Sequence, residues 1–167
     1  MSLSNRDTNV LDVIFGGETF EKLSPLPEEK RQDLRERERE GIKLAEADKL
    51  TEAAAIFTAL LAEEETYASA YNNRAQVHRL QDQYELALAD LANALKYSRQ
   101  DPEVLKQAYT QRAIIRKAQG DADGALRDFE LGGQYGNAVA KEIAVKENPY
   151  AKLCNAMMKE SMKQLYP

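Results

Sequence analysis

From Lys30 onward the sequence favours helix, and short polar segments separate the helical stretches. Three windows carry the clearest pattern: LTEAAAIFTALL from Leu50, YELALADLANAL from Tyr84 and ADGALRDFELGG from Ala122. The polar segments at their starts are AEADKL, LQDQYE and AQGDAD. This alternation of amphipathic helices and polar turns predicts an all-α protein that is built from antiparallel helix pairs.

The three windows repeat one another. Each has an alanine followed four positions later by a large residue: Ala53 and Phe57, Ala87 and Leu91, Ala125 and Phe129. Twelve positions before each alanine lies another small residue: Gly41, Ala75 and Ala113. The interval between the second and third alanines is four positions longer than the interval between the first and second. A period of roughly 34 residues indicates stacked helix pairs, in which small residues allow close approach and the large residue fills the remaining space.

The third unit is preceded by four extra residues, within the segment SRQDPEVLK. Asp101 suits the N-cap of a helix and Pro102 suits its first turn. Because four residues make about one α-helical turn, we expect the insertion to lengthen a helix or loop without rotating the repeat face.

The small and large positions at this spacing resemble the tetratricopeptide repeat, from about Leu34 to Asn137. The resemblance implies a right-handed superhelical stack of three helix pairs. The proline that usually ends a unit is absent, since Glu65 and Arg99 stand there, and Arg37 replaces an aromatic residue of the first unit. The expected divisions are an arm and linker at 1–33, repeats at 34–67, 68–101 and 102–137, and capping helices at 138–167.

Both ends of the chain leave alternatives open. The apolar segment VLDVIF, residues 10–15, could pack on the repeats, occupy the groove of its own chain or serve as a short motif for a partner. In the last helix, Asn148 is expected to be the cap and Pro149 the first residue. Its apolar stripe would either cover the end of the stack or form an adaptable docking surface: Leu153, Met157, Met158, Met162 and Leu165.

Two end segments, VLDVIFGGETF and NPYAKLCNAMM, surround three repeats that include ASAYNNRAQ. Together they resemble the tetratricopeptide repeat protein 36 family over nearly the whole chain. That resemblance implies a protein that binds the heat-shock chaperone Hsp70 and carries no enzymatic activity.

Composition narrows the classes of function. The net charge of −5 and the lack of a long basic block argue against nucleic acid and against an anionic membrane surface. The chain has no run of 18 apolar residues, and its start does not resemble a signal peptide. One cysteine among 167 residues allows no internal disulfide, so we expect a cytoplasmic or nuclear protein.

The sequence shows no recognisable pattern of catalytic residues. His78 is the only histidine and Cys154 the only cysteine, so the usual zinc ligands are missing. We expect His78 to be a packed or hydrogen-bonded structural residue. The segments GGETF and LGGQYG lack the lysine and hydroxyl residue of a phosphate-binding loop. The many carboxylates are expected on solvated helix faces, and no cofactor or metal is predicted.

Polar residues on the first helices of the repeats form the candidate binding site instead. Helical register predicts a concave, amide-rich groove of modest positive charge that could bind a peptide or helix: Asn72, Asn73, Gln76, Arg79, Gln107, Gln111, Ile114 and Lys117. Some tetratricopeptide repeats clamp an acidic C-terminus with five residues. The resemblance places Glu38, Ile42, Asn73, Gln107 and Gln111 at those positions, and only Asn73 matches. The sequence therefore predicts a non-catalytic adaptor without that clamp, or alternatively a structural or client-stabilising subunit that uses the arm and the last helix.

Overall fold

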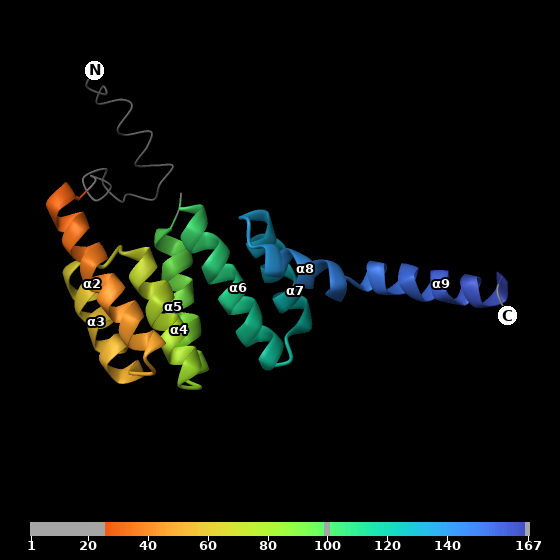
Figure 1. The fold of residues 1–167 in the computed structure, drawn as a ribbon, viewed down its shortest axis with the longest axis horizontal. Helices are drawn as coiled ribbons and strands as arrows, with labels where there is room; N and C mark the ends of the chain where they lie inside the picture. The colour runs from red at the N-terminus through yellow and green to blue at the C-terminus, as the bar shows by residue number, and fades with distance from the viewer. Residues whose placement is uncertain (1–25, 99–100, 166–167) are drawn as a thin grey trace, which may run out of the picture. The chain divides into compact units, whose positions relative to one another are not determined.

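The computed structural model describes residues 26–98 and 101–165, and all regular structure in these residues is α-helical (Figure 1). The helices are α2 (Glu28–Glu46), α3 (Leu50–Glu63), α4 (Ala68–Leu80), α5 (Tyr84–Tyr97), α6 (Pro102–Ala118), α7 (Ala122–Gln134), α8 (Ala138–Glu147) and α9 (Pro149–Leu165). The chain divides into two units after Glu36, and the packing described below is that of the second, from Arg37 onward. The apolar segment at residues 10–15 lies outside the described residues.

The first helix begins at Glu28, two residues before Lys30, where helical sequence is expected to begin. The expected arm and linker, residues 1–33, therefore include the first turns of α2. Glu28 and Glu29 explain the early start, because acidic side chains in the first turn interact favourably with the positive end of the helix dipole.

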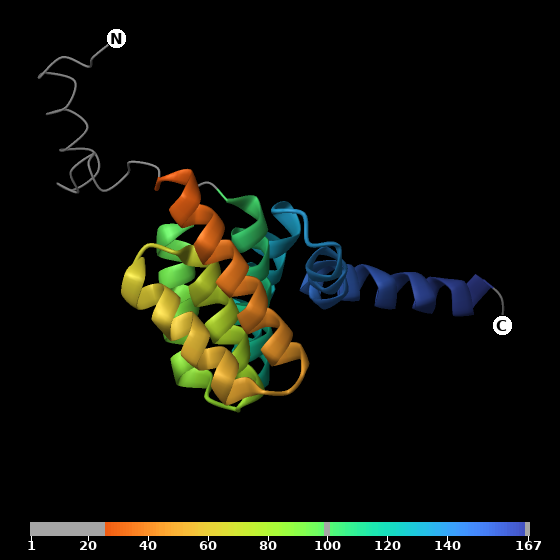
Figure 2. The same ribbon diagram turned by 60° about the vertical axis from the view of Figure 1, so that its left-hand side comes forward.

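From α3 to α8, each helix packs against the next, most extensively α4 on α5 and α6 on α7 (Figures 1 and 2). The positions shared by the repeats form the core as predicted. Ala53, Ala87 and Phe57 are at most 1% exposed, as are Leu91, Ala75 and Ala113. Burying a side chain as large as Phe57 stabilises the fold by about 1.5–3 kcal/mol. A Cβ atom at Gly41 would lie only 2.8 Å from a Phe57 ring carbon, so any side chain at this position would force the buried ring to shift.

The turns within the helix pairs share one backbone feature. Asp48, Asp82 and Gly120 adopt positive φ angles of 61°, 58° and 84°. Their two separations along the chain equal those of the core alanines, so the turns repeat in step with the core. A left-handed residue just after a helix ends it and reverses the chain, and aspartate tolerates this conformation better than most residues.

The insertion before the third unit lengthens a helix, as predicted. Helix α6 has 17 residues where α4 has 13. The Asp101 carboxylate caps α6 by accepting from the backbone nitrogens of Glu103 at 2.9 Å and Val104 at 3.4 Å, and Pro102 opens the helix. The extra turn preserves the register of the face that carries Gln107 and Gln111.

The two C-terminal helices differ in what they bury. Helix α8 packs on α7, where Ala140 and Ala144 join Phe129 in the core. A Cβ atom at Gly133 would lie 2.9 Å from the Lys141 Cα atom, so glycine permits this close approach. In contrast, α9 has no buried residue and extends away from α8 in both views (Figures 1 and 2).

The stack of helix pairs is thus confirmed. Of the two alternatives for the apolar stripe of the last helix, the one in which it covers the end of the stack is wrong. The stripe from Leu153 to Leu165 is exposed because no helix in the described part of the chain packs over it. Among the helices that the structure describes, none combines the length and the apolar character needed to cross a bilayer.

Candidate peptide-binding groove

A groove of about 600 Å³ lies between the first helices of the repeats. Its walls come from α2, α3, α4 and α6, and from Asn137 at the start of α8. Five of its lining residues are apolar: Ile42, Ala45, Phe57, Val77 and Leu80. Six have uncharged polar side chains: Asn73, Gln76, Gln107, Thr110, Gln111 and Asn137. Among the described residues that line it, two are charged, Glu46 and Arg79, so amides rather than cations dominate the polar chemistry.

Five of the eight residues predicted for this face line the groove: Asn73, Gln76, Arg79, Gln107 and Gln111. Two others lie outside its lining. Ile114 is 41% exposed, and the Lys117 ammonium pairs with the Glu147 carboxylate at 2.9 Å.

Asn72 is the eighth predicted residue, and its expected place on the open face is wrong. Its side chain is only 1% exposed, because it is held between α4 and α6 by two other amides. Asn72 Nδ2 donates to Gln107 Oε1 at 2.8 Å, and Asn72 Oδ1 accepts from Gln111 Nε2 at 3.0 Å. The residue therefore supports the groove from beneath.

Glu38 also differs from the expectation that it faces a ligand. It is 9% exposed and accepts three side-chain hydrogen bonds. Tyr67 Oη donates at 2.6 Å, Asn73 Nδ2 at 2.7 Å, and the Ser69 hydroxyl donates as well. These donors come from 29 to 35 residues away, so no local pattern could reveal them. Hydrogen bonding to the carboxylate thus joins the first repeat to the second.

Two further carboxylates, Asp90 and Asp128, are buried, which corrects the expectation that acidic residues lie on solvated faces. Each forms a bidentate ion pair with an arginine sixteen residues earlier. Arg74 donates to Asp90 at 2.8 and 2.7 Å, and Arg112 donates to Asp128 at the same two distances. These hydrogen bonds raise the pKa of both arginines, against the opposing effect of burial.

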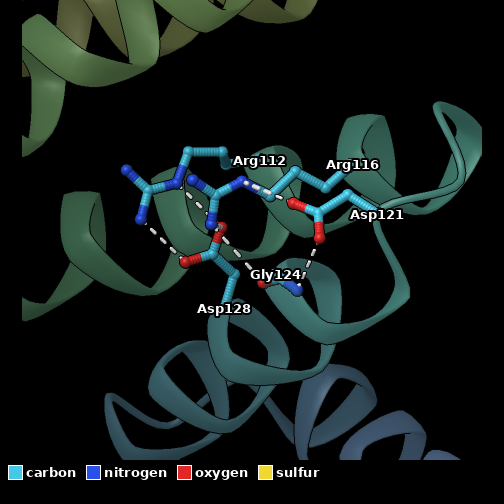
Figure 3. Close-up of polar contacts among 5 residues, drawn as sticks. All are labelled: Arg112, Arg116, Asp121, Gly124 and Asp128. Atoms are coloured by element: carbon cyan, nitrogen blue, oxygen red, sulfur yellow. Dashed lines mark hydrogen bonds and ion pairs between the residues drawn. The ribbon is translucent and has the colours of Figure 1, made fainter.

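A second basic residue approaches each buried aspartate. In the third repeat, Arg116 Nη1 lies 2.8 Å from Asp128, as Figure 3 shows. At the equivalent place in the second repeat, His78 Nε2 lies 3.7 Å from Asp90. His78 Nδ1 also hydrogen-bonds the Gln83 side chain at 2.8 Å. The only histidine is therefore a packing residue, as predicted.

Figure 3 also shows the start of helix α7, next to the ion pairs of Asp128. Asp121 accepts from the backbone nitrogen of Gly124 at 2.9 Å and so caps the helix. The Arg116 guanidinium lies 3.8 Å from this carboxylate, between it and Asp128. Arg116 thus connects the capped start of α7 to the buried ion pair.

The groups that could perform catalysis lie on separate elements. His78 is on α4, engaged with Asp90 and Gln83, whereas Cys154 is exposed on α9. Across residues 26–98 and 101–165, no three histidine, cysteine, aspartate or glutamate side chains gather as a metal site.

Solved structures share the fold. The first tetratricopeptide repeat domain of Spaghetti (RPAP3), bound to the HSP90 peptide SRMEEVD, has a TM-score of 0.61 and 21% identity, covering 70% of this chain and 90% of that one. The Yersinia enterocolitica chaperone SycD, in complex with a peptide of the translocator YopD, has a TM-score of 0.58 and 13% identity, covering 76% of this chain and 95% of that one.

No family model matches the chain. Tetratricopeptide repeat protein 36 of Xenopus tropicalis is 37% identical, covering 95% of this chain and 77% of that protein. The human protein is 36% identical over 89% of this chain and 78% of its own length, and the Drosophila melanogaster homolog is 34% identical over 99% and 97%. The similarity covers both ends as well as the repeats, and the chain therefore belongs to the tetratricopeptide repeat protein 36 family.

Proposed function

We propose that this protein is a non-catalytic adaptor that binds a peptide or helix of a partner protein in the groove described above. The observation that carries the proposal is the convergence of amide side chains from α4 and α6 on one groove that apolar side chains also line. Amides supply both donors and acceptors to a bound segment, and the apolar side chains supply area that binding removes from water. Support also comes from the repeat domains of RPAP3 and SycD, whose structures contain peptides.

The heat-shock chaperone Hsp70 is the partner that the family resemblance implies, and we propose it as the first to test. The mode of binding would differ from the carboxylate clamp. Gln107 and Gln111 stand where the clamp has a lysine and an arginine, and the buried Glu38 stands where it has a lysine. An acidic C-terminus would find no cationic pair there.

Calorimetry with the purified chaperone tests this proposal. We expect the double substitution Asn73→Ala and Arg79→Ala to weaken binding about tenfold or more, equivalent to about 1.4 kcal/mol. The double substitution Arg127→Ala and Gln134→Ala removes similar groups from positions on α7 outside the groove, and it should leave affinity unchanged. Equal affinity of both variants and the natural chain would contradict a role for the groove, provided that circular dichroism shows all three folded.

A structural or client-stabilising subunit is the second candidate, and the exposure of α9 favours it. Five large apolar side chains of this helix are 58–72% exposed: Leu153, Met157, Met158, Met162 and Leu165. A methionine-rich surface adapts to varied apolar partners. If this function holds, ending the chain at Asn148 or deleting residues 1–25 abolishes association while the groove substitutions leave it intact. The adaptor predicts the opposite pattern.

We also propose that the protein works in the cytoplasm or nucleus. Cys154 is a free thiol on an exposed helix. A reducing compartment preserves such a group, whereas an oxidising one promotes intermolecular disulfides. Fractionation of cells that express the natural chain tests this location.

A further inference from the structure

Helix α8 repeats the pattern of the first helices of the second and third pairs. Each of these helices has a fully buried alanine: Ala70 in α4, Ala108 in α6 and Ala140 in α8. In α4 and α6, the residues four and five positions later contact the second helix of the pair. In α6, Arg112 pairs with Asp128 of α7, and Ala113 shares a core cluster with Phe129 of α7. The equivalent arginine of α4 pairs with Asp90 of α5 in the same way.

The equivalent face of α8 is open. Its two positions are Ala144 and Val145, and Val145 is 60% exposed, whereas Ala75 and Ala113 at the same place in α4 and α6 are 0% exposed. Both residues line a hollow of about 440 Å³ between α7 and α8, which we call the α7–α8 hollow. Its other lining residues are Glu130, Gly133, Gln134, Lys141 and Asn148. The α7–α8 hollow is therefore the place where the second helix of a fourth pair would lie.

The connection after α8 explains why α9 does not fill the α7–α8 hollow of its own chain. Within the three helix pairs, each turn has three residues, and the middle one has a positive φ: 47–49, 81–83 and 119–121. Only Asn148 separates α8 from α9, and its φ is −59° and its ψ 122°. Pro149 favours this extended conformation, because proline disfavours the helical region for the residue before it. The chain therefore does not reverse, and α9 extends away from α8 (Figures 1 and 2).

The apolar face of α9 suits a hollow of this kind. At about 100° per residue, six large side chains lie on one half of the helix, and each is at least 58% exposed: Tyr150, Leu153, Met157, Met158, Met162 and Leu165. Its three lysines, Lys152, Lys159 and Lys163, lie on the other half, so they stay in water when the apolar half is covered. Large, flexible methionine side chains can fill a hollow that glycine, alanine and valine line.

A second copy of the chain supplies the partner for both faces. Each copy has one open α7–α8 hollow and one α9 without a buried residue, so a reciprocal exchange of α9 between two copies covers all four faces. Such an interface is self-complementary, as two-fold symmetry requires. Exchange of an element between copies is favoured where a short connection prevents the element from folding back on its own chain.

We propose that this protein forms a two-fold symmetric dimer in which α9 of each copy lies in the α7–α8 hollow of the other. The inference goes beyond the proposed adaptor function, because no residue that lines the peptide-binding groove takes part in the exchange. The dimer presents two grooves to a partner. In dilute solution the two copies separate, and α9 then adds nothing to the stability of its own repeats.

Sedimentation equilibrium of the purified full-length chain tests the dimer. We expect twice the mass of one chain at about 100 µM, and dissociation on dilution. Val145→Glu places a charge in the α7–α8 hollow and Met157→Glu places one on the apolar half of α9, so each should raise the dissociation constant at least about tenfold. Val139→Glu and Ala156→Glu are matched controls at exposed positions of the same two helices, outside both faces, and should leave it unchanged. Circular dichroism shows whether each variant is folded.

Mixing two variants distinguishes exchange from direct pairing of two α9 helices. The Val145→Glu chain keeps an intact α9, and the Met157→Glu chain keeps an intact α7–α8 hollow. The two should therefore form a mixed dimer through one of the two contacts, although each alone is a monomer. Direct pairing of α9 with α9 predicts instead that the Val145→Glu chain still forms a dimer by itself.

The connection between α8 and α9 provides a further variant. Replacing Asn148 and Pro149 with Gln-Gly-Asp, the turn at residues 119–121, should allow α9 to fold back into the α7–α8 hollow of its own chain. We expect this variant to be a monomer at every concentration. Its α9 amides should exchange hydrogen more slowly than those of the natural chain in dilute solution.

The outcomes separate this inference from the adaptor function. A natural chain that stays monomeric at the highest concentration overturns the dimer and leaves the adaptor function intact. A dimer that survives Val145→Glu, or that Val139→Glu weakens equally, overturns the exchange as well. If the pure chain is a monomer and Val145→Glu abolishes binding to a different protein, the α7–α8 hollow belongs to that protein and the exchange is again wrong. The Asn73→Ala and Arg79→Ala variant should remain a dimer, and unchanged partner affinity in that variant contradicts the groove alone.

Discussion

At the scale of residues, the most consequential side chains are buried charges. Asp90 and Asp128 lie between the two helices of their repeats, with side chains 7% and 2% exposed. Burying a carboxylate is unfavourable unless charge and hydrogen bonds compensate it. The arginine sixteen residues earlier provides both, in the same geometry in each repeat. The pairs therefore fix how the two helices of a unit face each other.

Removing the aspartate of a buried ion pair should destabilise the fold far more than removing an exposed carboxylate. We expect Asp128→Ala to lower the free energy of unfolding by about 3–5 kcal/mol, because Arg112 and Arg116 would lose their shared carboxylate. Urea denaturation followed by circular dichroism measures the change. Glu130→Ala, an exposed acidic position on the same helix, should stay within about 0.5 kcal/mol of the natural chain. A loss below about 1 kcal/mol for Asp128→Ala would mean that the pair does not hold the repeat together.

At the scale of elements, Glu147 connects three helices near the C-terminal end of the stack. Its carboxylate lies 2.9 Å from the Lys117 ammonium on α6 and 2.7 Å from the Lys152 ammonium on α9. Hydrogen bonds from Lys152 and Lys117 lower the pKa of Glu147 from 4.5 to about 2. All three side chains are well exposed, so solvent and salt screen the interaction.

The lowered pKa of Glu147 predicts how the stabilisation of the fold by this carboxylate changes with pH. Because the folded pKa is below the unfolded one, the stabilisation is complete above about pH 4.5 and disappears as the pH falls through about 2. The difference in unfolding free energy between the natural chain and Glu147→Gln should therefore shrink only within that window. NMR titration of the Glu147 carboxyl carbon supplies the direct measurement. Lys152→Met should move its pKa back toward 4.5, and an unchanged pKa in that variant would rule out the contact.

At the scale of the whole molecule, the stack from α3 to α8 buries a continuous core, and α9 adds nothing to it. Helix α8 closes the end through Ala140 and Ala144, beside the close approach at Gly133. In a solenoid of repeats, stability comes from each unit and its contacts with neighbours. Helix α9 therefore contributes no buried side chain to the stack among the described residues.

Removing α9 tests whether the repeats are stable without this helix. Ending the chain at Asn148 should change the unfolding free energy of the repeats by less than about 1 kcal/mol, because α9 has no buried residue and its ion pair between Lys152 and Glu147 is exposed. Thermal and urea denaturation of the two chains provide the measurement. Ala140→Glu places a charge in the core of α8 and should be strongly destabilising by comparison, at about 3 kcal/mol or more. If the truncated chain instead loses several kcal/mol, α9 does act as a cap in solution.

The sequence by itself determined the repeated architecture. The spacing of Ala53, Ala87 and Ala125, with a large residue four positions later, predicts the helix pairs and their core, because both packing and turns follow local periodicity. Asp101 and Pro102 likewise predict the start of α6. Register along the first helices was sufficient to bring Asn73, Gln76, Arg79, Gln107 and Gln111 to one surface.

Only the tertiary structure decided which polar residues face solvent and which support the fold. Asn72 and Asn73 are neighbours in sequence, yet Asn72 is buried between helices because its partners come from α6. Glu38, Asp90 and Asp128 became interior residues through donors far along the chain or on the facing helix. The exposure of α9 was equally undetermined, since an apolar stripe specifies a face but does not specify what covers it. Periodicity is local, whereas burial of a polar group depends on distant partners that satisfy it.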